Sequence, residues 1–178
     1  MSATRLFILG ALTSGGPMHG HQIRRAAQED RTELWADVKP GSLYGALHRM
    51  ATDGVIEAVR TERDGNLPER TVYGVTDAGR AELAKLRLGI LTDARLRPDP
   101  VDLALVYTDD LPREELHALV KTRRADVDTT LSGWLELREQ AAPYLTGLEP
   151  LGFDHTIMRL ETELAWLDRL LGELGRKP

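Results

Sequence analysis

The chain has 178 residues and no cysteine, which excludes a disulfide framework and thiolate chemistry. It has no run of about 18 apolar residues, so the sequence predicts no transmembrane helix. Its N-terminus lacks the basic start and the small-residue cleavage site of a signal peptide. Together these absences predict a cytoplasmic protein, with enough length for one large domain or two small ones.

Residues 39–56 predict a short helix with two distinct faces. Leu43, Leu47 and Met50 recur at i, i+4 and i+7, which directs one apolar stripe toward a core. Ser42 is the predicted N-cap, and Gly54 is the predicted C′ residue that follows the helix. The opposite face is left to residues that packing does not require, which are Tyr44, Gly45, His48 and Arg49. A helix of this kind is suited to enter a DNA groove.

The segments around this helix predict two further helices and a β-hairpin. Residues 6–12 are apolar and end at a Gly-Gly-Pro turn, and residues 19–28 predict the second helix. Residues 55–62 and 70–75 read as strands, with turn residues between them. The order helix, helix, helix, hairpin is that of a winged helix-turn-helix with a small hairpin wing.

Short motifs within the first half occur in a characteristic order, at residues 9–12, 16–20, 41–44, 47–56 and 73–80. Together they resemble the PadR family of bacterial transcriptional regulators. The resemblance implies a repressor that dimerises through C-terminal helices and leaves its operator when a small, often aromatic, molecule binds. The C-terminal half fits the family in its length and helical character.

Three features depart from the family's usual pattern. His21 stands where tyrosine is usual, Gly45 stands where proline is usual, and the wing at residues 65–70 is less basic. A glycine inside a helix costs at most about 1 kcal/mol, and the missing proline ring lets the helix end approach DNA closely. The departures therefore concern the DNA sequence that is read more than DNA binding itself.

The charge is distributed unevenly along the chain. The formal net charge is −5, yet residues 1–90 carry 12 Lys+Arg against 11 Asp+Glu. Residues 91–178 carry 11 Lys+Arg against 17 Asp+Glu, so the acidity lies in the C-terminal half. We expect few phosphate contacts per chain, and an affinity that depends on two copies of the DNA-binding domain.

Helices are predicted for the rest of the chain. A helix from Asp77 to about Leu96, capped by Thr76 or Asp77, leads to a boundary between a DNA-binding domain at residues 1–96 and a helical domain at residues 97–178. Helices at residues 101–107 and 112–142 follow. The apolar side of the longer one comprises Leu116, Val120, Val127, Leu131 and Trp134.

The final predicted helix, residues 154–175, carries a heptad seam. Its members follow spacings of 3, 4, 3, 4 and 3, and they are Ile157, Leu160, Leu164, Leu167, Leu171 and Leu174. The seam either packs only on the 112–142 helix of its own chain or forms much of a homodimer interface. The family resemblance favours the dimer, which would hold two winged helices about one DNA turn apart on a two-fold operator.

The candidate DNA-binding residues are Lys39, Ser42, Tyr44, Gly45, His48, Arg49, Arg63, Asn66 and Arg70. Hydroxyl groups of Ser42 and Tyr44 suit phosphates, which position a helix without reading sequence. Arg49 suits a bidentate contact with guanine. The wing residues would reach the backbone or the adjacent minor groove of double-stranded DNA.

Other site chemistries find less support in the sequence. Three tryptophans, Trp35, Trp134 and Trp166, are candidates to stack on an aromatic effector, with core packing as the alternative. The histidines at residues 19, 21 and 48 have no cysteine and few placed carboxylates beside them, so we expect no metal and no cofactor. No phosphate loop or nucleophile motif is present, which argues against an enzyme.

A second function class remains open at this point. Winged helices also serve as protein–protein interaction modules without specific DNA binding, and the fold alone does not decide between the two. Such a module would show an apolar patch where this chain has Tyr44, His48 and Arg49.

Overall fold

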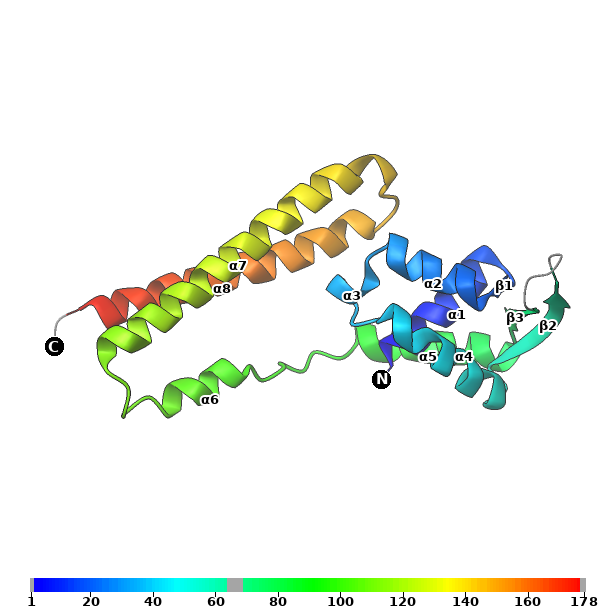
Figure 1. Ribbon diagram of the computed structural model, residues 1–178, viewed down its shortest axis with the longest axis horizontal. Coiled ribbons are helices and arrows are strands. Elements are labelled where there is room, and N and C mark those ends of the chain that lie inside the picture. The colour runs from blue at the N-terminus through cyan, green and yellow to red at the C-terminus, as the bar shows by residue number, and fades with distance from the viewer. Residues whose placement is uncertain (1, 64–68, 177–178) are drawn as a thin grey trace. The chain divides into compact units, whose positions relative to one another are not determined.

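The computed structural model describes residues 2–63 and 69–176, and the chain divides into two compact units, Met1–Leu96 and Arg97–Pro178 (Figure 1). Helices make up most of both units, and a small sheet belongs to the first. The predicted fold class, mostly helical with a small β-structure, is confirmed.

The helices of the first unit pack their apolar faces into one core. They are α1 (Ala3–Gly15), α2 (Gly20–Glu29), α3 (Thr32–Trp35), α4 (Leu43–Thr52) and α5 (Asp77–Leu91). The predicted apolar stripe of α4 is confirmed, because Leu43, Leu47 and Met50 are at most 1% exposed. Burying each such side chain contributes roughly 1.5–3 kcal/mol, so the inner face of α4 is firmly held. The sequence does not predict α3, which is too short to show helical periodicity.

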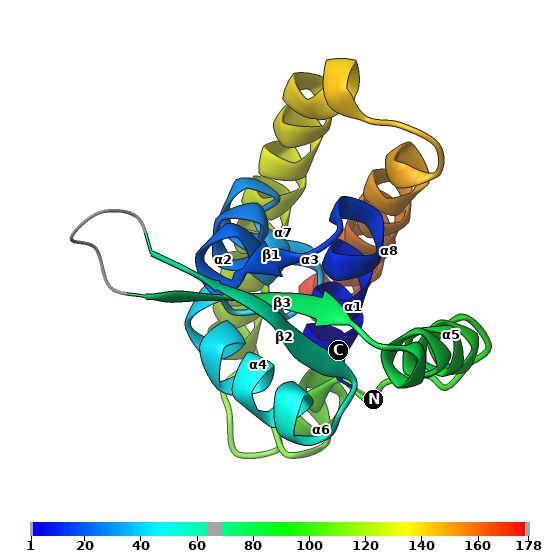
Figure 2. The same cartoon turned by 90° about the vertical axis from the view of Figure 1, so that its right-hand side faces the viewer.

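A three-stranded antiparallel sheet accompanies these helices. Its strands β1 (Met18–His19), β2 (Ile56–Glu62) and β3 (Arg70–Val75) lie in the order β1-β3-β2 (Figure 2). The predicted hairpin is confirmed as β2 and β3, with an irregular register between Ala58 and Arg60. The structure adds a third strand, β1, to the predicted hairpin, and in it His19 pairs with Val72 of β3. Two residues are too few to reveal strand alternation in a sequence, so β1 is not predicted.

The C-terminal end of α4 follows the prediction. Gly54 adopts a φ of +73°, in the left-handed region that favours glycine. Its N–H donates to the Ala51 carbonyl, and the Val55 N–H donates to the Met50 carbonyl, both at 3.1 Å. This pair of bonds is a Schellman motif, so the C′ role of Gly54 is confirmed.

The N-terminal end of α4 corrects the prediction. Ser42 does not cap the helix, because its Oγ donates to the Lys39 carbonyl at 2.8 Å. Pro40–Ser42 form a 3-10 turn, η1, that leads directly into α4. The hydroxyl therefore closes the turn before the helix and satisfies no N–H group of α4.

Helix α5 begins as predicted and ends early. Its N-cap is Thr76, whose Oγ1 accepts a hydrogen bond from the Gly79 N–H at 3.1 Å. The predicted end near Leu96 is wrong, because the helix stops at Leu91. The Asp93 carboxylate accepts hydrogen bonds from the backbone N–H and the Nε of Arg95. Such local side-chain bonds offer the backbone an alternative to the helix.

The second unit contains α6 (Pro100–Val106), α7 (Arg113–Ala141) and α8 (Glu149–Gly175), with a 3-10 turn η2 (Ala142–Tyr144) after α7. Helix α8 starts before the predicted Asp154. The Glu149 carboxylate accepts a hydrogen bond from the Thr146 N–H at 2.7 Å, and a proline stands in the first turn, as is common at helix starts. None of the helices in the described residues is both long and apolar enough to cross a membrane.

Ion pairs and one arginine join α7 to α8 in antiparallel order. Oppositely charged side chains pair at Arg123–Glu163, Arg124–Asp168 and Arg138–Asp154, with N···O distances of 2.8, 2.6 and 2.8 Å. The hydrogen bond from Arg124 lowers the pKa of the Asp168 carboxyl group. At the far end, the Arg113 guanidinium donates to the carbonyls of Glu173, Leu174 and Arg176. These contacts satisfy carbonyls that the end of α8 leaves without helical partners.

The heptad seam of α8 is covered in part within one chain. Ile157 is 7% exposed and Leu167 is fully buried, whereas the other seam leucines are half-buried. On the facing side, Val120 of α7 is 7% exposed. The seam thus stabilises the α7–α8 hairpin of the single chain.

Candidate nucleic-acid interface

The outer face of α4 carries the predicted polar side chains. Tyr44 is 42% exposed, and Gly45, His48 and Arg49 are exposed as well. The Arg49 guanidinium folds back along the helix, since a Cβ at Gly45 would stand 3.5 Å from its Nη1. Arg49 therefore reaches toward the N-terminal end of α4, the end that contacts base edges in helix-turn-helix proteins. Within the described part of the chain, this guanidinium forms no ion pair.

The start of α2 lies beside this face and is organised by His19. The His19 Nδ1 accepts a hydrogen bond from the Gln22 N–H at 3.3 Å, and the Gln22 Oε1 accepts one from the His19 N–H at 3.0 Å. This capping box satisfies two N–H groups at the helix start. The predicted role of His19 in stabilising the turn before α2 is thereby explained. His21 is exposed, with its ring centroid 6.1 Å from that of His19.

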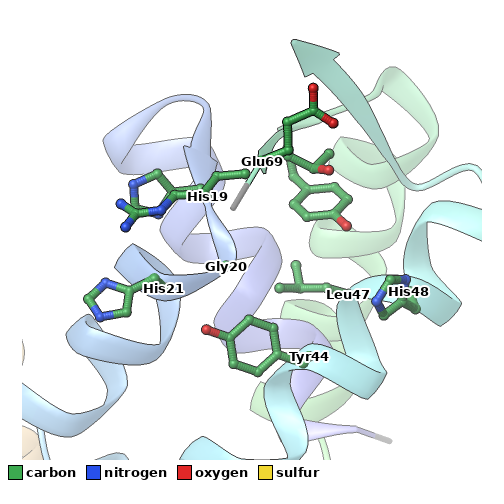
Figure 3. Close-up of a pocket in the computed structure, with 10 residues that line it drawn as sticks. His19, Gly20, His21, Tyr44, Leu47, His48 and Glu69 are labelled. Carbon is green, nitrogen blue, oxygen red and sulfur yellow. The ribbon is translucent and has the colours of Figure 1, made fainter. Parts of the chain in front are cut away.

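A pocket of about 390 Å³ opens between α2, α4 and β3 (Figure 3). Imidazole groups line it from two helices, because His21 belongs to α2 and His48 to α4. The full lining consists of His19, Gly20, His21, Tyr44, Leu47, His48, Glu69, Arg70, Thr71 and Tyr73. Residues of the predicted recognition helix and of the predicted wing therefore line the same pocket.

Tyr44 is seated against a glycine of α2. A Cβ at Gly20 would stand 2.9 Å from the Tyr44 Cε1 and 3.1 Å from the Leu47 Cδ1. With any other residue at this position, the Tyr44 ring would have to shift. Sequence reasoning used Gly20 as part of a motif and missed this role, which only the packing of α2 on α4 reveals.

The remaining candidate DNA-binding residues lie before α4 and in the wing. Lys39 is exposed and precedes η1, where its carbonyl holds the Ser42 hydroxyl. Arg63 follows β2 and Arg70 begins β3, and both are exposed. Asn66 lies outside the described residues.

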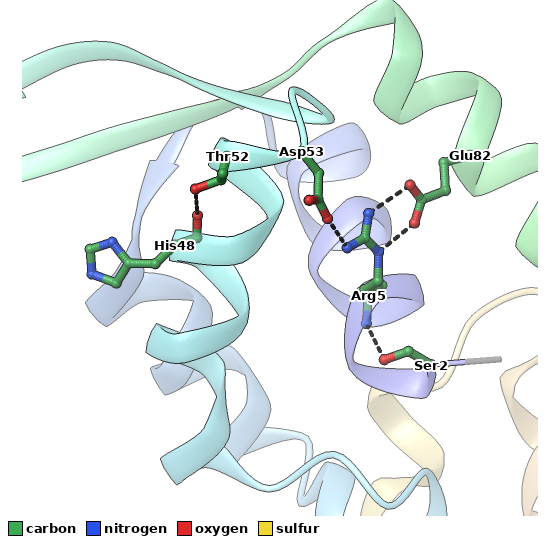
Figure 4. Close-up of polar contacts among 6 residues, drawn as sticks. All are labelled: Ser2, Arg5, His48, Thr52, Asp53 and Glu82. Atoms are coloured by element: carbon green, nitrogen blue, oxygen red, sulfur yellow. Dashed lines mark hydrogen bonds and ion pairs between the residues drawn. The ribbon is translucent and has the colours of Figure 1, made fainter.

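A three-way ion pair lies at the C-terminal end of α4 (Figure 4). The Arg5 guanidinium of α1 donates to both carboxylate oxygens of Glu82 in α5, and to Asp53 Oδ2 at 2.6 Å. The hydrogen bonds that Arg5 donates, to Glu82 first and to Asp53 second, raise the pKa of Arg5 above its ordinary value. Sequence reasoning missed this contact because Asp53 and Glu82 are 48 and 77 residues away from Arg5 along the chain.

The candidate effector tryptophans are divided between the two units. Trp35 belongs to the first unit, is 58% exposed and donates its Nε1–H to the Asp30 carbonyl at 2.9 Å. Trp134 of α7 contacts Phe153 edge to face, with ring centroids 5.7 Å apart. Trp166 of α8 is half-buried on the same turns as Glu163 and Asp168, whose partners are Arg123 and Arg124.

No group of three histidine, aspartate or glutamate side chains in the described residues is arranged to hold a metal ion. The imidazoles of the pocket are thus too dispersed for first-row metal coordination, which needs ligands near 2 Å from one point.

The sequence comparisons agree with this architecture. Residues 8–85 match the sequence model of the family described as transcriptional regulator PadR-like. Over 187 aligned residues, the chain is 22% identical to the negative transcriptional regulator PadR of Bacillus subtilis, covering 99% of this chain and 100% of that protein. Over 58 residues it is 41% identical to the transcriptional regulator Rv3488 of Mycobacterium tuberculosis, covering 33% of this chain and 52% of that protein.

The structure comparisons show the same fold over the whole chain. The crystal structure of Bacillus subtilis PadR in complex with operator DNA has a TM-score of 0.74 and 23% identity, covering 98% of both chains. The complex of that protein with p-coumaric acid has a TM-score of 0.73 and 19% identity, covering 98% of this chain and 97% of the other. The N-terminal unit of the chain is thus similar in sequence to the PadR-like family of transcriptional regulators, and the whole chain shares the fold of these solved structures.

Proposed function

We propose that the protein is a repressor that binds a two-fold DNA operator as a homodimer. Helix α4 would enter the major groove, and the wing would lie along the neighbouring backbone. The observation that carries this proposal is the division of α4 into a buried apolar face and an exposed face with Tyr44, His48 and Arg49. Arg49 would read a guanine, Tyr44 would donate to a phosphate, and Lys39 would neutralise another.

The same face argues against the protein-interaction alternative. A protein-binding winged helix would expose a contiguous apolar patch on α4. Here the apolar side chains of α4 point into the core, and the outer face presents a phenol, an imidazole and a guanidinium. DNA binding is also what the solved complex of Bacillus subtilis PadR with operator DNA illustrates for that relative.

We propose that the second unit forms the dimer contact. The seam leucines Leu160, Leu164, Leu171 and Leu174 remain partly exposed, whereas Ile157 and Leu167 are covered within one chain. A further apolar stripe faces outward, from the residue before α8 into the first half of that helix. Its members Leu148, Leu151 and Met158 are 79%, 60% and 64% exposed. Side chains of this size exposed in a row call for a partner surface.

A small aromatic acid is the proposed effector class, by analogy with the p-coumaric acid complex of Bacillus subtilis PadR. Such a ligand would relieve repression only by binding the DNA-competent and DNA-incompetent dimers with different affinities. Trp134 and Trp166 of the second unit are the proposed stacking groups. Trp35 is the corresponding candidate in the first unit. A repressor that binds an operator would act in the cytoplasm.

The experiment that tests the proposal is selection of genomic DNA fragments by the purified full-length protein. We expect enrichment of one or a few fragments that share a two-fold sequence, each bound by two chains as measured by light scattering. Fragments enriched without a common sequence would contradict operator recognition. A two-fold sequence bound by a single chain would contradict the dimer alone.

A further inference from the structure

Thr76 ties the end of α4 to the start of α5. Its hydroxyl donates to the Gly54 carbonyl at 2.8 Å and accepts a hydrogen bond from the Gly79 N–H at 3.1 Å. Its backbone N–H donates to the Val55 carbonyl at 3.2 Å. Gly54 and Val55 directly follow Asp53, the C-cap of α4. A single residue thus caps α5 and holds both carbonyls at the point where the chain leaves α4.

Gly79 allows the two helices to approach this closely. A Cβ at Gly79 would overlap the Val55 carbonyl oxygen and would stand 2.8 Å from the Val75 Cγ2. The carbonyl oxygen belongs to the backbone, so no side-chain rotation relieves the overlap. With any other residue at this position, the first turn of α5 must move away from the end of α4.

Arg5 of α1 clamps the same two helix ends from a third side (Figure 4). Its Nη1 donates to Asp53 Oδ2 at 2.6 Å, and its Nη2 donates to Glu82 Oε2 at 2.7 Å. Glu82 lies about one helical turn beyond Gly79 in α5. We call this set of contacts the α4–α5 joint, and it comprises Arg5, Asp53, Gly54, Val55, Thr76, Gly79 and Glu82.

Helix α5 is the last helix of the first unit, and residues 92–99 lead from it to α6 of the second unit. The proposed dimer contact belongs to the second unit, and the proposed recognition helix belongs to the first. Along the chain, each α4 is therefore connected to the dimer contact through α5. The angle between α4 and α5 then affects where each recognition helix meets its half-site.

We propose that the α4–α5 joint sets the half-site spacing that the dimer accepts, with Thr76 and Gly79 as positioning residues that do not contact DNA. The inference rests on the proposed function and adds a determinant of operator specificity to it. Changing the spacer by one base pair moves a half-site by about 3.4 Å and rotates it by about 34–36°. A dimer with a stiff joint should reject such a change.

The length of α5 amplifies a small displacement at the joint. Helix α5 has 15 residues, which corresponds to a length of about 22 Å. A displacement of about 1 Å across its first turn of about 5.4 Å tilts the helix by roughly 10° and moves its far end by about 4 Å. That movement is as large as one base-pair step, so a change at Gly79 is sufficient to alter the accepted spacing.

Fluorescence anisotropy of the full-length protein tests the proposal on its selected operator and on duplexes with spacers one or two base pairs longer or shorter. For the unmodified protein, we expect a Kd at least about tenfold higher when the spacer changes by one base pair. Thr76→Val keeps the side-chain shape but loses both hydroxyl bonds, and it should reduce this ratio below about threefold. Thr76→Ser keeps the hydroxyl and should restore the ratio. Gly79→Ala should move the preferred spacer by at least one base pair.

The ratio of Kd values separates positioning from a merely structural role. Loss of folded protein weakens binding to every duplex equally and leaves the ratio unchanged. Thr92→Val is the matched control, because the Thr92 hydroxyl donates to the Leu88 carbonyl at the other end of α5. It should keep the spacing preference of the unmodified protein. Circular dichroism shows whether Gly79→Ala is folded, and the Thr76 variants decide the matter if it is not.

Three outcomes would overturn the inference. In the first, Thr76→Val keeps the full spacing preference. In the second, Thr92→Val loses the preference as Thr76→Val does. In the third, the unmodified protein binds all spacers equally, which would show that α5 does not hold α4 in place. Failure of the unmodified protein to bind any two-fold operator would instead overturn the proposed function, so the two failures are distinguishable.

Discussion

At the scale of single residues, Arg49 carries the proposed base recognition. Its guanidinium is exposed, forms no ion pair within the described residues, and reaches toward the N-terminal end of α4. Replacing Arg49 by Ala should weaken operator binding by about 1–3 kcal/mol and relax the base preference at one position of each half-site. Anisotropy titrations against the operator and its single-base variants measure both effects.

Arg159 in α8 provides the control for this substitution, because it is also exposed and belongs to the second unit. Arg159→Ala should leave operator affinity unchanged. Equal affinities of Arg49→Ala and the unmodified protein would mean that α4 presents another face to DNA.

Gly20 holds Tyr44 in place, which leads to a second prediction at this scale. A methyl group at Gly20 would stand 2.9 Å from the Tyr44 Cε1, so the exposed ring must move. Gly20→Ala should therefore weaken operator binding. Unfolding stability should change little, because alanine is favoured over glycine in a helix by about 1 kcal/mol, which offsets the cost of moving the ring. Operator titration and thermal melting together check this separation.

Gly10 in α1 is the matched control, since a Cβ there meets no atom within 4 Å. Gly10→Ala should leave DNA binding intact. If Gly20→Ala binds the operator as tightly as Gly10→Ala does, Tyr44 contributes nothing to the contact.

The residues on α4 were accessible to sequence reasoning because the helical period of 3.6 residues assigns each of them to one of two faces. The pocket was not accessible, because its lining comes from residues 19–21, 44–48 and 69–73, which only folding brings together. The His-Gly-His motif was visible and suggested a metal site as an alternative. Its structural meaning, a capping box with an exposed second imidazole, depends on where α2 begins.

At the scale of elements, the Arg5 contact fixes the C-terminal end of α4 against α1 and α5. The side chains of Arg5 and Glu82 are 25% and 24% exposed, so solvent screens this contact only in part. Arg5→Ala should lower the free energy of unfolding by about 1–2 kcal/mol. Thermal unfolding followed by circular dichroism provides the measurement.

Arg25→Ala is the comparison, since Arg25 forms one fully exposed pair with Glu29 on α2. We expect no measurable change from it. A loss of stability for Arg5→Ala no larger than that for Arg25→Ala would show that the three-way ion pair does not support α4.

The elements with strong periodicity or clear end signals were predictable. Helix α7 and strand β3 were predicted nearly to the residue, and the Gly54 stop was correct. The predicted Ser42 cap and the predicted end of α5 were wrong. The Ser42 hydroxyl bonds backward to Lys39, before η1, and the Asp93 carboxylate bonds within its own loop, so neither side chain serves the helix. The short elements α3 and β1 carry too few residues to form a pattern.

At the scale of the whole molecule, the two units divide the proposed work between DNA contact and assembly. The outward stripe of α8 is the test of assembly, with Leu151 and Met158 as its central members. Leu151→Asp with Met158→Asp should convert the dimer to a monomer of unchanged helix content, because both side chains are exposed in the single chain. Light scattering gives the mass, and Arg159→Asp on the same helix is the control. A double variant that remains dimeric would place the interface elsewhere.

The overall organisation was predictable in outline, whereas the use of the heptad seam was not. A seam of leucines fits either an intrachain hairpin or a dimer, since both bury the same stripe. The structure covers Ile157 and Leu167 within one chain and leaves Leu151 and Met158 exposed, so the outward face becomes the stronger candidate for the dimer. Sequence periodicity alone does not say which partner covers an apolar stripe.

The central claim is that this chain recognises a specific DNA sequence through α4. The most direct test is the Kd of the full-length protein for its selected operator and for a scrambled duplex, measured by anisotropy across a salt series. The account predicts a preference for the operator of at least about 10³-fold that persists at physiological salt. Equal Kd values for the two duplexes, both lost as salt rises, would contradict it.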